Sequence, residues 1–294
     1  MNYFPPPSAR PELPTFTVGG RTLRFGGRAY LMGVINVTPD SFSDGGQFLD
    51  HQKAIAQGRA LVEAGASIID IGGESTRPGA DPVTADEEIE RVIPVIRGLR
   101  RESDAWISID TYKASVAEAA LDAGADIVND ISGLGFDEEM APLVARRECG
   151  LVIMHIKKTP KTMQEEIHYG DLLGEVRAFF EERVARARAA GIKGSRIILD
   201  PGIGFGKTVE HNLELLRELS KFIELGHPLL VGTSRKSFLG AVTGKPVEQR
   251  LMATAASVAC AVLTGADILR VHDVAEMVDV VDVAQAICGR GDPR

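Results

Sequence analysis

Eight short apolar segments recur along the chain, and most of them end in a polar residue or a glycine. They span Leu31–Asn36, Ser67–Gly72, Trp106–Asp110, Asp126–Asp130, Leu151–His155, Ile197–Asp200, Leu229–Gly232 and Ile268–His272. Continuous Val, Ile and Leu runs of this length are typical of parallel strands buried on both faces. The pattern therefore predicts eight parallel strands that are covered by helices.

Segments with apolar residues at helical spacing lie between the predicted strands. They span Gln52–Ala64, Ala85–Arg101, Ala114–Ala123, Glu138–Arg147, Leu172–Ala190, Val209–Leu225, Val247–Leu263 and Ala275–Ile287. Gly65, Gly124 and Gly265 each follow such a segment and precede a strand, which predicts left-handed residues just past three helix ends. The recurrence of this junction indicates a repeated helix–strand unit.

Eight alternating strands and helices are compatible with a closed barrel or with an open doubly wound sheet. The open sheet usually carries a glycine-rich turn after its first strand, but Asn36 is followed by Val-Thr-Pro-Asp-Ser. The count of eight and the polar strand ends favour an α/β fold of the (β/α)8 TIM barrel type, with residues 15–294 as one domain. The alternating stretch Thr15–Phe25 predicts an N-terminal β-hairpin that closes the bottom of the barrel.

Composition excludes several classes of partner. The formal net charge is −8, which argues against nucleic-acid binding, because such proteins need Lys and Arg to neutralise phosphates. Residues 1–14 include five prolines and predict a flexible tail instead of a targeting signal. The weakly polar run Met252–Leu263 is too short to span a membrane. Three widely spaced cysteines suit a reducing compartment, so a cytoplasmic protein is expected.

Polar residues are concentrated at the predicted strand ends, where a TIM barrel builds its active site. The acids and amides there are Asp70, Glu74, Asp110, Asn129, Asp130, Asp200 and Asp273. One such acid is more often a helix N-cap. Several carboxylates at one barrel mouth need cationic or N–H-rich partners to offset their desolvation. The group therefore predicts a ligand with several N–H donors, such as a guanidine-like heterocycle.

Cationic side chains occupy the same rim of the predicted barrel. They are Arg77, Arg235, Lys236, Arg270 and His272. Arg270 and His272 are two residues apart on one strand and so point to one face, which predicts a bound anion. Asn36, Asp40 and Ser41 offer the oxygen ligands that Mg²⁺ prefers. The sequence has no HExxH and no Cys/His cluster with zinc spacing.

The glycine-rich run after Asp200 is not a phosphate-binding loop. Gly206-Lys207-Thr208 resembles the end of a P-loop, but Pro201 stands where that motif needs glycine. The glycines are better explained by a backbone that lies close under a flat ligand. His155 is more readily explained as a buried structural histidine than as a metal ligand. Two long Gly/Pro-rich loops, Val37–Asp50 and Gly73–Thr84, predict mobile lids.

Seven segments, in order from the first strand to the last, closely resemble the dihydropteroate synthase family. They begin at Met32 (MGVINVTPDSFSDGG), Asp70 (DIGGESTRPG), Ile107 (ISIDT), Ile127 (IVNDISG), Leu199 (LDPGIGFGKT), Gly232 (GTSRKSF) and Arg270 (RVHDV). The first two are long and specific to the family. The loop after His155 departs from the family pattern at Ile156–Lys158.

The resemblance implies a transferase of folate biosynthesis. Such an enzyme condenses 6-hydroxymethyl-7,8-dihydropterin diphosphate with 4-aminobenzoate and releases 7,8-dihydropteroate and diphosphate. It also implies Mg²⁺ as cofactor, a homodimer and a sulfonamide target. The two small-molecule substrates are the expected partners, with no nucleic acid and no membrane.

Site residues follow from the same resemblance. Those implied for the pterin are Asp110, Asn129, Asp200 and Lys236, with Asp70 in support. Those implied for the diphosphate are Asn36 through Mg²⁺, Thr76, Arg77, Arg270, Val271 and His272. Those implied for the aminobenzoate are Phe42, Pro78, Phe205 and Ser237. The residues expected to act in catalysis are Asp110, Asp200, Lys236, Arg270 and His272.

Two other functions fit part of the pattern. A pterin-binding methyltransferase domain would share the barrel and the Asp/Asn/Asp pocket, but it would not need the Val37–Asp50 lid or the Ser-Arg-Lys-Ser run at Ser234. A non-catalytic pterin-binding protein would keep the pocket without turnover. The lids and the pair Arg270 and His272 count against it.

Overall fold

Eight parallel strands form a closed barrel in the computed structural model, which describes residues 12–38, 46–77 and 79–291. The strands are β3 (Tyr30–Asn36), β4 (Ile68–Gly72), β5 (Trp106–Asp110), β6 (Ile127–Asp130), β7 (Gly150–Met154), β8 (Ile197–Asp200), β9 (Leu230–Val231) and β10 (Ile268–Val271). Their spatial order is β8-β7-β6-β5-β4-β3-β10-β9. A parallel bridge between Leu199 and Leu229 joins β8 to the residue before β9 and closes the ring. The predicted (β/α)8 barrel is confirmed, and the open sheet is excluded.

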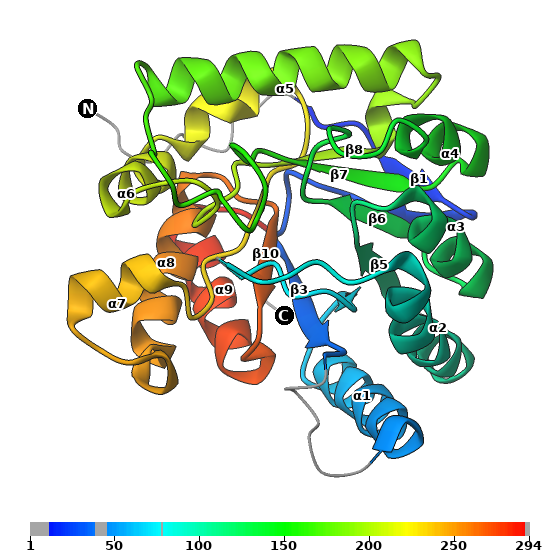
Figure 1. Cartoon of the computed structure of the whole chain (residues 1–294). Coiled ribbons are helices and arrows are strands. Elements are labelled where there is room, and N and C mark those ends of the chain that lie inside the picture. Colours follow the sequence, from blue (N-terminus) through cyan, green and yellow to red (C-terminus); the bar gives the residue numbers. More distant parts are fainter. Residues whose placement is uncertain (1–11, 39–45, 78, 292–294) are drawn as a thin grey trace.

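Helices surround the strands on the outside of the barrel (Figure 1). They are α1 (Gly46–Glu63), α2 (Ala85–Glu102), α3 (Ala114–Ala123), α4 (Met140–Arg147), α5 (Leu172–Ala189), α6 (Val209–Arg217), α7 (Ser237–Thr243), α8 (Leu251–Thr264) and α9 (Val274–Ile287). Gly65, Gly124 and Gly265 have φ of 113°, 111° and 114°, as the repeated junction predicted. No helix in the described part of the chain is long and apolar enough to cross a membrane.

Two of the predicted helices are partly 3₁₀ helix in the structure. The segment Val209–Leu225 divides into α6 and a 3₁₀ helix, Leu219–Leu225, with Glu218 between them. The segment from Val247 begins with a 3₁₀ turn, and α8 starts only at Leu251. Apolar spacing near 3.6 does not distinguish these tighter turns from a continuous helix.

The predicted N-terminal hairpin is present as β1 (Phe16–Val18) and β2 (Arg21–Leu23). Its Phe16 ring is fully buried and packs edge-on against Trp106 of β5, with ring centroids 5.7 Å apart. Gly150 makes room for this ring, because a Cβ there would lie 2.4 Å from the Phe16 Cζ. The hairpin therefore seals the N-terminal end of the barrel.

The barrel interior has an apolar lower layer and a polar upper layer. Each of the eight strands contributes one residue to the apolar cluster around the hairpin, namely Met32, Ile68, Trp106, Ile127, Val152, Ile198, Leu230 and Ile268. Side chains two residues apart on a strand share a face. On five of these strands, the residue two positions after the apolar one is polar and also points inward. These residues are Asp70, Ser108, Asn129, Asp200 and Arg270. Alternation within the strands thus places a layer of polar side chains directly above the apolar layer that the hairpin closes.

Candidate active site

Arg270 belongs to the polar layer and joins two acids from other strands. Its Nε donates to Asp70 Oδ2 at 2.7 Å, and its Nη2 donates to Asp110 Oδ2 at 2.8 Å. Asp70 is fully buried and Asp110 is 9% exposed. The guanidinium offers two donors in a fixed fork, so one side chain neutralises carboxylates from β4 and β5 at once.

Each of these acids keeps one buried oxygen without a hydrogen-bond partner among the described residues. These atoms are Asp70 Oδ1 and Asp110 Oδ1. Asn129 on β6 donates through Nδ2 to Asp70 Oδ2 at 3.1 Å, so Asp70 supports the amide next to Asp110. A buried carboxylate oxygen without a donor is costly. The unpaired Asp110 oxygen is therefore a ready acceptor for a ligand N–H group.

The electrostatics of this cluster favour proton uptake by Asp110. Burial raises the pKa of Asp110 to about 7, the positive charge of Arg270 opposes the rise, and the negative charge of Asp70 adds to it. Arg270 stays protonated, because Asp70 and Asp110 raise its pKa against the effect of burial. The protonation state of Asp110 therefore responds to pH near neutrality.

Asp200 and Lys236 form a second polar group on the other side of the interior. Asp200 Oδ1 accepts from Gly202 N at 2.7 Å, and burial raises the pKa of this carboxyl while Lys236 lowers it. Burial lowers the pKa of Lys236 to about 8, against the opposing effect of Asp200. The Lys236 ammonium donates to Ile203 O and lies 4.5 Å from the centroid of the Phe205 ring. These contacts bring three predicted site residues together.

The glycine-rich run after β8 packs against protein atoms. Gly202, Gly204 and Gly206 have φ of 67°, 83° and 61°. A Cβ at Gly202 would lie 2.0 Å from His155 O, and one at Gly204 would lie 2.9 Å from Lys236 Cδ. The glycines therefore let this loop approach His155 and Lys236 closely.

His155 is a buried structural residue, as expected. Its ring packs edge-on against Phe179 at 4.9 Å, and burial lowers its pKa to about 2. Lys207 Nζ lies 3.0 Å from His155 Nδ1 and donates to Phe205 O at 2.9 Å. A buried Lys207 thus supports the loop that carries Phe205.

His272 is held at the rim by Ser234. Its Nδ1 lies 2.9 Å from Ser234 Oγ, and its backbone N donates to the same oxygen at 3.2 Å. Burial and the charges of Arg270, Arg235 and Arg77 lower the pKa of His272 to about 4. The ring is therefore neutral at pH 7, and it would meet an anion as a hydrogen-bond donor.

The structure places the remaining described residues of the predicted site at strand ends, on a loop and at the start of a helix. Asn36 ends β3 and is half-buried, Thr76 is half-buried and Arg77 is exposed on the β4–α2 loop. Val271 packs in the outer core, so only its backbone is available to a ligand. Ser237 is exposed as the first residue of α7. Phe42 and Pro78 lie outside the described residues, as do most of residues 1–14 and much of the Val37–Asp50 loop.

Several contacts that build the site had no signal in the sequence. Ser234 contacts His272, and Lys207 donates to the backbone oxygen of Phe205. Tyr112 and Lys113, which follow β5, contact Glu74. Only the fold brings these partners within reach. Within the described ranges, no group of three His, Cys, Asp or Glu side chains could hold a metal ion.

Comparison with known proteins identifies the class to which this barrel belongs. The family model of pterin binding enzymes matches residues 32–272, so the chain belongs to the pterin-binding enzymes. A dihydropteroate synthase of Synechocystis sp. is 51% identical over 287 residues, which cover 97% of this chain and 96% of the relative. The chain is therefore a member of the dihydropteroate synthase family.

Solved structures agree with this assignment. The chain is similar to a Xanthomonas albilineans dihydropteroate synthase with 4-aminobenzoic acid, with a TM-score of 0.87 and 43% identity over 94% of this chain and 98% of the other. A structure of the Xanthomonas albilineans enzyme with 7,8-dihydropteroate has a TM-score of 0.84 and 41% identity, covering 93% and 98% of the two chains.

Proposed function

We infer that this chain catalyses the dihydropteroate synthase reaction. It condenses 6-hydroxymethyl-7,8-dihydropterin diphosphate with 4-aminobenzoate and releases 7,8-dihydropteroate and diphosphate. Relatives of nearly the same length carry this name, and the polar layer above the sealed floor fits the chemistry. The observation that carries the inference is the acceptor-rich interior, in which buried acids from β4 and β5 pair with Arg270 and the buried Asp200 of β8 adds a third carboxylate.

The pterin would occupy the side of the interior that accepts hydrogen bonds. Its guanidine-like edge presents N–H donors, and Asp110 and Asp200 present carboxylate oxygens in a buried environment. We assign Asn129 to the same edge, with Asp70 behind it. Lys236 has a charged ammonium that suits the ring carbonyl oxygen or ring nitrogens.

The diphosphate would lie at the cationic rim. Breaking the C–O bond puts negative charge on the diphosphate and positive charge on the pterin methylene. Arg270, Arg77 and the neutral His272 can stabilise the first charge. The nearby carboxylates can stabilise the second. The aniline nitrogen of aminobenzoate is a neutral nucleophile, so the attack needs no strong general base. Phe205 and Ser237, with Phe42 and Pro78, are proposed to frame the aminobenzoate.

Asn36 is the residue that would hold Mg²⁺. Magnesium bound to phosphates keeps several waters and takes few protein ligands, all oxygens. A single half-buried amide at the end of β3 fits that requirement. When bound, the ion would neutralise charge on the diphosphate.

Conversion of isotope-labelled 4-aminobenzoate into dihydropteroate tests the inference directly. The purified chain is mixed with pterin diphosphate and Mg²⁺, with and without a chelator. Labelled dihydropteroate that is lost on chelation is the expected result. Pterin binding without turnover would support the non-catalytic alternative. In a separate assay supplied with a methylated pterin as donor, methyl transfer without condensation would support the methyltransferase.

The affinity for pterin is expected to rise with pH near neutrality. Only the ionised carboxylate of Asp110 accepts N–H groups with both oxygens, and its pKa is about 7. The ionised fraction grows roughly eightfold between about pH 6 and pH 7.5, and the association constant should follow it. Calorimetry across this range checks the prediction. An Asp110→Asn variant should lose the pH dependence, and an equally steep slope in that variant would contradict it.

We also propose that the chain is a homodimer joined through α7, α8 and α9. Of the seven exposed large hydrophobic residues among those described, five lie on or between these helices: Val242, Val247, Met252, Val283 and Ile287. An exposed apolar patch of this kind marks an interaction surface. Met252, at 73% exposure, is the most exposed of them.

Replacing Met252 with glutamate is expected to shift the protein from dimer to monomer, because a charge in an apolar interface is costly. Light scattering after size-exclusion chromatography measures the mass. The matched control is Phe136→Glu, an exposed apolar residue between β6 and α4. An unchanged dimer in the Met252 variant would place the interface elsewhere.

A cytoplasmic location also stays a proposal, supported by three free cysteines.

A further inference from the structure

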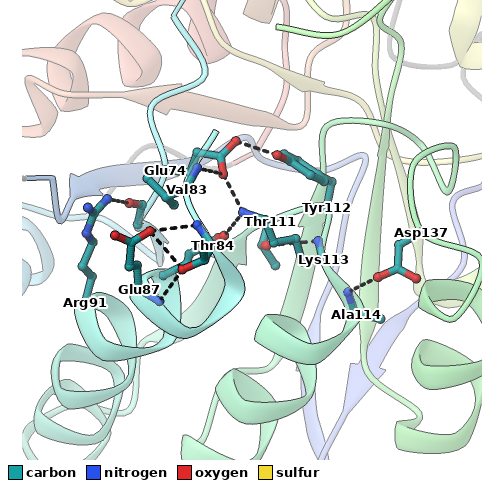
Figure 2. Close-up of polar contacts among 12 residues, drawn as sticks. Glu74, Val83, Thr84, Glu87, Arg91, Thr111, Tyr112, Lys113, Ala114 and Asp137 are labelled. Carbon is teal, nitrogen blue, oxygen red and sulfur yellow. Dashed lines mark hydrogen bonds and ion pairs between the residues drawn. The ribbon is translucent and has the colours of Figure 1, made fainter. Parts of the chain in front are cut away.

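The β4–α2 loop, which carries Thr76 and Arg77, is closed at its base by one carboxylate. Glu74 Oε2, near the start of the loop, accepts from Val83 N near its end at 3.2 Å. Arg91 of α2 donates to Gly73 O at 2.8 Å. Figure 2 shows these contacts between the start of the loop and the start of α2. We call Glu74 and Val83 the neck of the loop, since their hydrogen bond joins the start of the loop to its end.

The neck is anchored to the residues that follow β5. Tyr112 donates its hydroxyl to Glu74 Oε1 at 2.7 Å, and Lys113 Nζ contacts Glu74 Oε2 at 2.5 Å (Figure 2). Lys113 Nζ also contacts Glu88 Oε2 of α2 at 2.6 Å. Tyr112 and Lys113 follow Asp110 by two and three residues. The same strand end therefore carries a proposed pterin ligand and holds the neck.

The anchor is an ion cluster that is largely withdrawn from solvent. The side chains of Glu74, Lys113 and Glu88 are 7%, 17% and 0% exposed. Burial raises the pKa of Glu88, while Lys113 opposes the rise. Burial lowers the pKa of Lys113, but hydrogen bonds to Glu74 and Glu88 raise it overall. Charge-assisted hydrogen bonds in such surroundings are strong and directional, so they define one position of the neck.

We propose that Glu74 is a positioning residue for the diphosphate half of the site. It acts through Thr76 and Arg77, which follow it by two and three residues, and Tyr112 holds its carboxylate in place. The inference rests on the proposed function, because it assumes that Arg77 meets the diphosphate. If Glu74 only stabilised the fold, its substitution would lower the stability of the protein and weaken the binding of both ligands alike.

Glu74→Gln is the first test, because the amide retains the shape of the carboxylate but weakens three contacts. We expect the affinity for pterin diphosphate to fall roughly tenfold, the loss typical of one charged hydrogen bond, and the affinity for bare pterin to stay unchanged. Tyr112→Phe is a milder variant that removes a single donor and should show a smaller loss of the same kind. Calorimetry with both ligands gives the comparison.

The matched control is Glu87→Gln. Glu87 lies one helix residue from Glu88, carries the same charge and accepts from Thr84 N at 2.9 Å in the cap of α2. It does not contact Glu74 in the structure, so both affinities should stay at the wild-type values. Equal losses for both ligands in Glu74→Gln would overturn the proposal, as would unchanged affinity for pterin diphosphate.

A double-mutant cycle with Arg77→Ala tests whether Glu74 acts through this arginine. If it does, Glu74→Gln costs much less diphosphate affinity in the Arg77→Ala background than in the wild type. Additive losses would contradict the coupling. Wild-type protein that fails to bind pterin diphosphate would instead overturn the proposed function, so the two failures are distinguishable.

Discussion

Replacement of Arg270 by alanine is expected to reduce kcat/KM by roughly a hundredfold to a few thousandfold, because removing one partner of a buried ion pair costs about 3–5 kcal/mol. Arg270 pairs with Asp70 and Asp110 at 2.7 and 2.8 Å. It is also the residue proposed to meet the diphosphate. Without it, two buried carboxylates lose their cation, and the pterin side of the pocket is disturbed together with the anion side.

The conservative variant Arg270→Lys should recover only part of this loss. One ammonium cannot reproduce the planar fork that reaches both acids. Steady-state kinetics at saturating aminobenzoate measures the effect, and thermal unfolding should show a midpoint lowered by several degrees for Arg270→Ala. Arg217→Ala is the control, because Arg217 is an exposed residue that pairs with Glu218. A kcat/KM of Arg270→Ala within fivefold of the wild-type value would contradict a role for Arg270 in the reaction.

Asp200→Asn is expected to weaken the binding of bare pterin roughly tenfold to a hundredfold, since an unsatisfied buried group costs about 1–3 kcal/mol. Asp200 Oδ1 accepts from Gly202 N at 2.7 Å. An asparagine that keeps its oxygen at this position turns its NH₂ group toward the pterin donors. An acceptor is then replaced by a donor in a buried pocket.

The same substitution should change Lys236. The negative charge of Asp200 works against the burial that lowers the Lys236 pKa to about 8, so its loss lowers that pKa further. Calorimetry with a pterin that lacks the diphosphate measures the binding. The control Asp137→Asn changes an acid that accepts from Ala114 N at 2.8 Å, away from the pocket. Equal pterin affinity in the wild type and in Asp200→Asn would contradict the assignment of this residue.

Much of the fold could be predicted because the signals are local. Apolar runs indicated eight strands within a residue or two of their observed ends, and Gly124 and Gly265 marked helix ends that have the expected left-handed φ. The N-terminal hairpin was predicted from the alternation of apolar and polar residues on both sides of Gly19. The division between α6 and the following 3₁₀ helix was missed, because apolar spacing carries no information about the tighter turn.

The sequence could group candidate site residues at the strand ends, but it could not predict which of them contact one another. Polar residues two positions after an apolar one on a parallel strand face the same interior, so Asp70, Asp200 and Arg270 could be grouped from the sequence. Their partners could not, because Arg270 on β10 reaches β4 and β5 across the interior. The sequence predicted a diphosphate site of cations beside a pterin site of acids. In the structure Arg270, one of those cations, pairs with two of the acids.

The amino-acid sequence by itself determined the barrel, the polar strand ends and the family, since these depend on residue types and spacing along the chain. Tertiary structure alone decided that burial lowers the pKa of His272 and raises the pKa of Asp110, and that Glu74 closes the neck of its loop. The physical reason is common to all three. Burial, distance and charge between residues far apart in the chain set these properties, and they exist only once the barrel has closed.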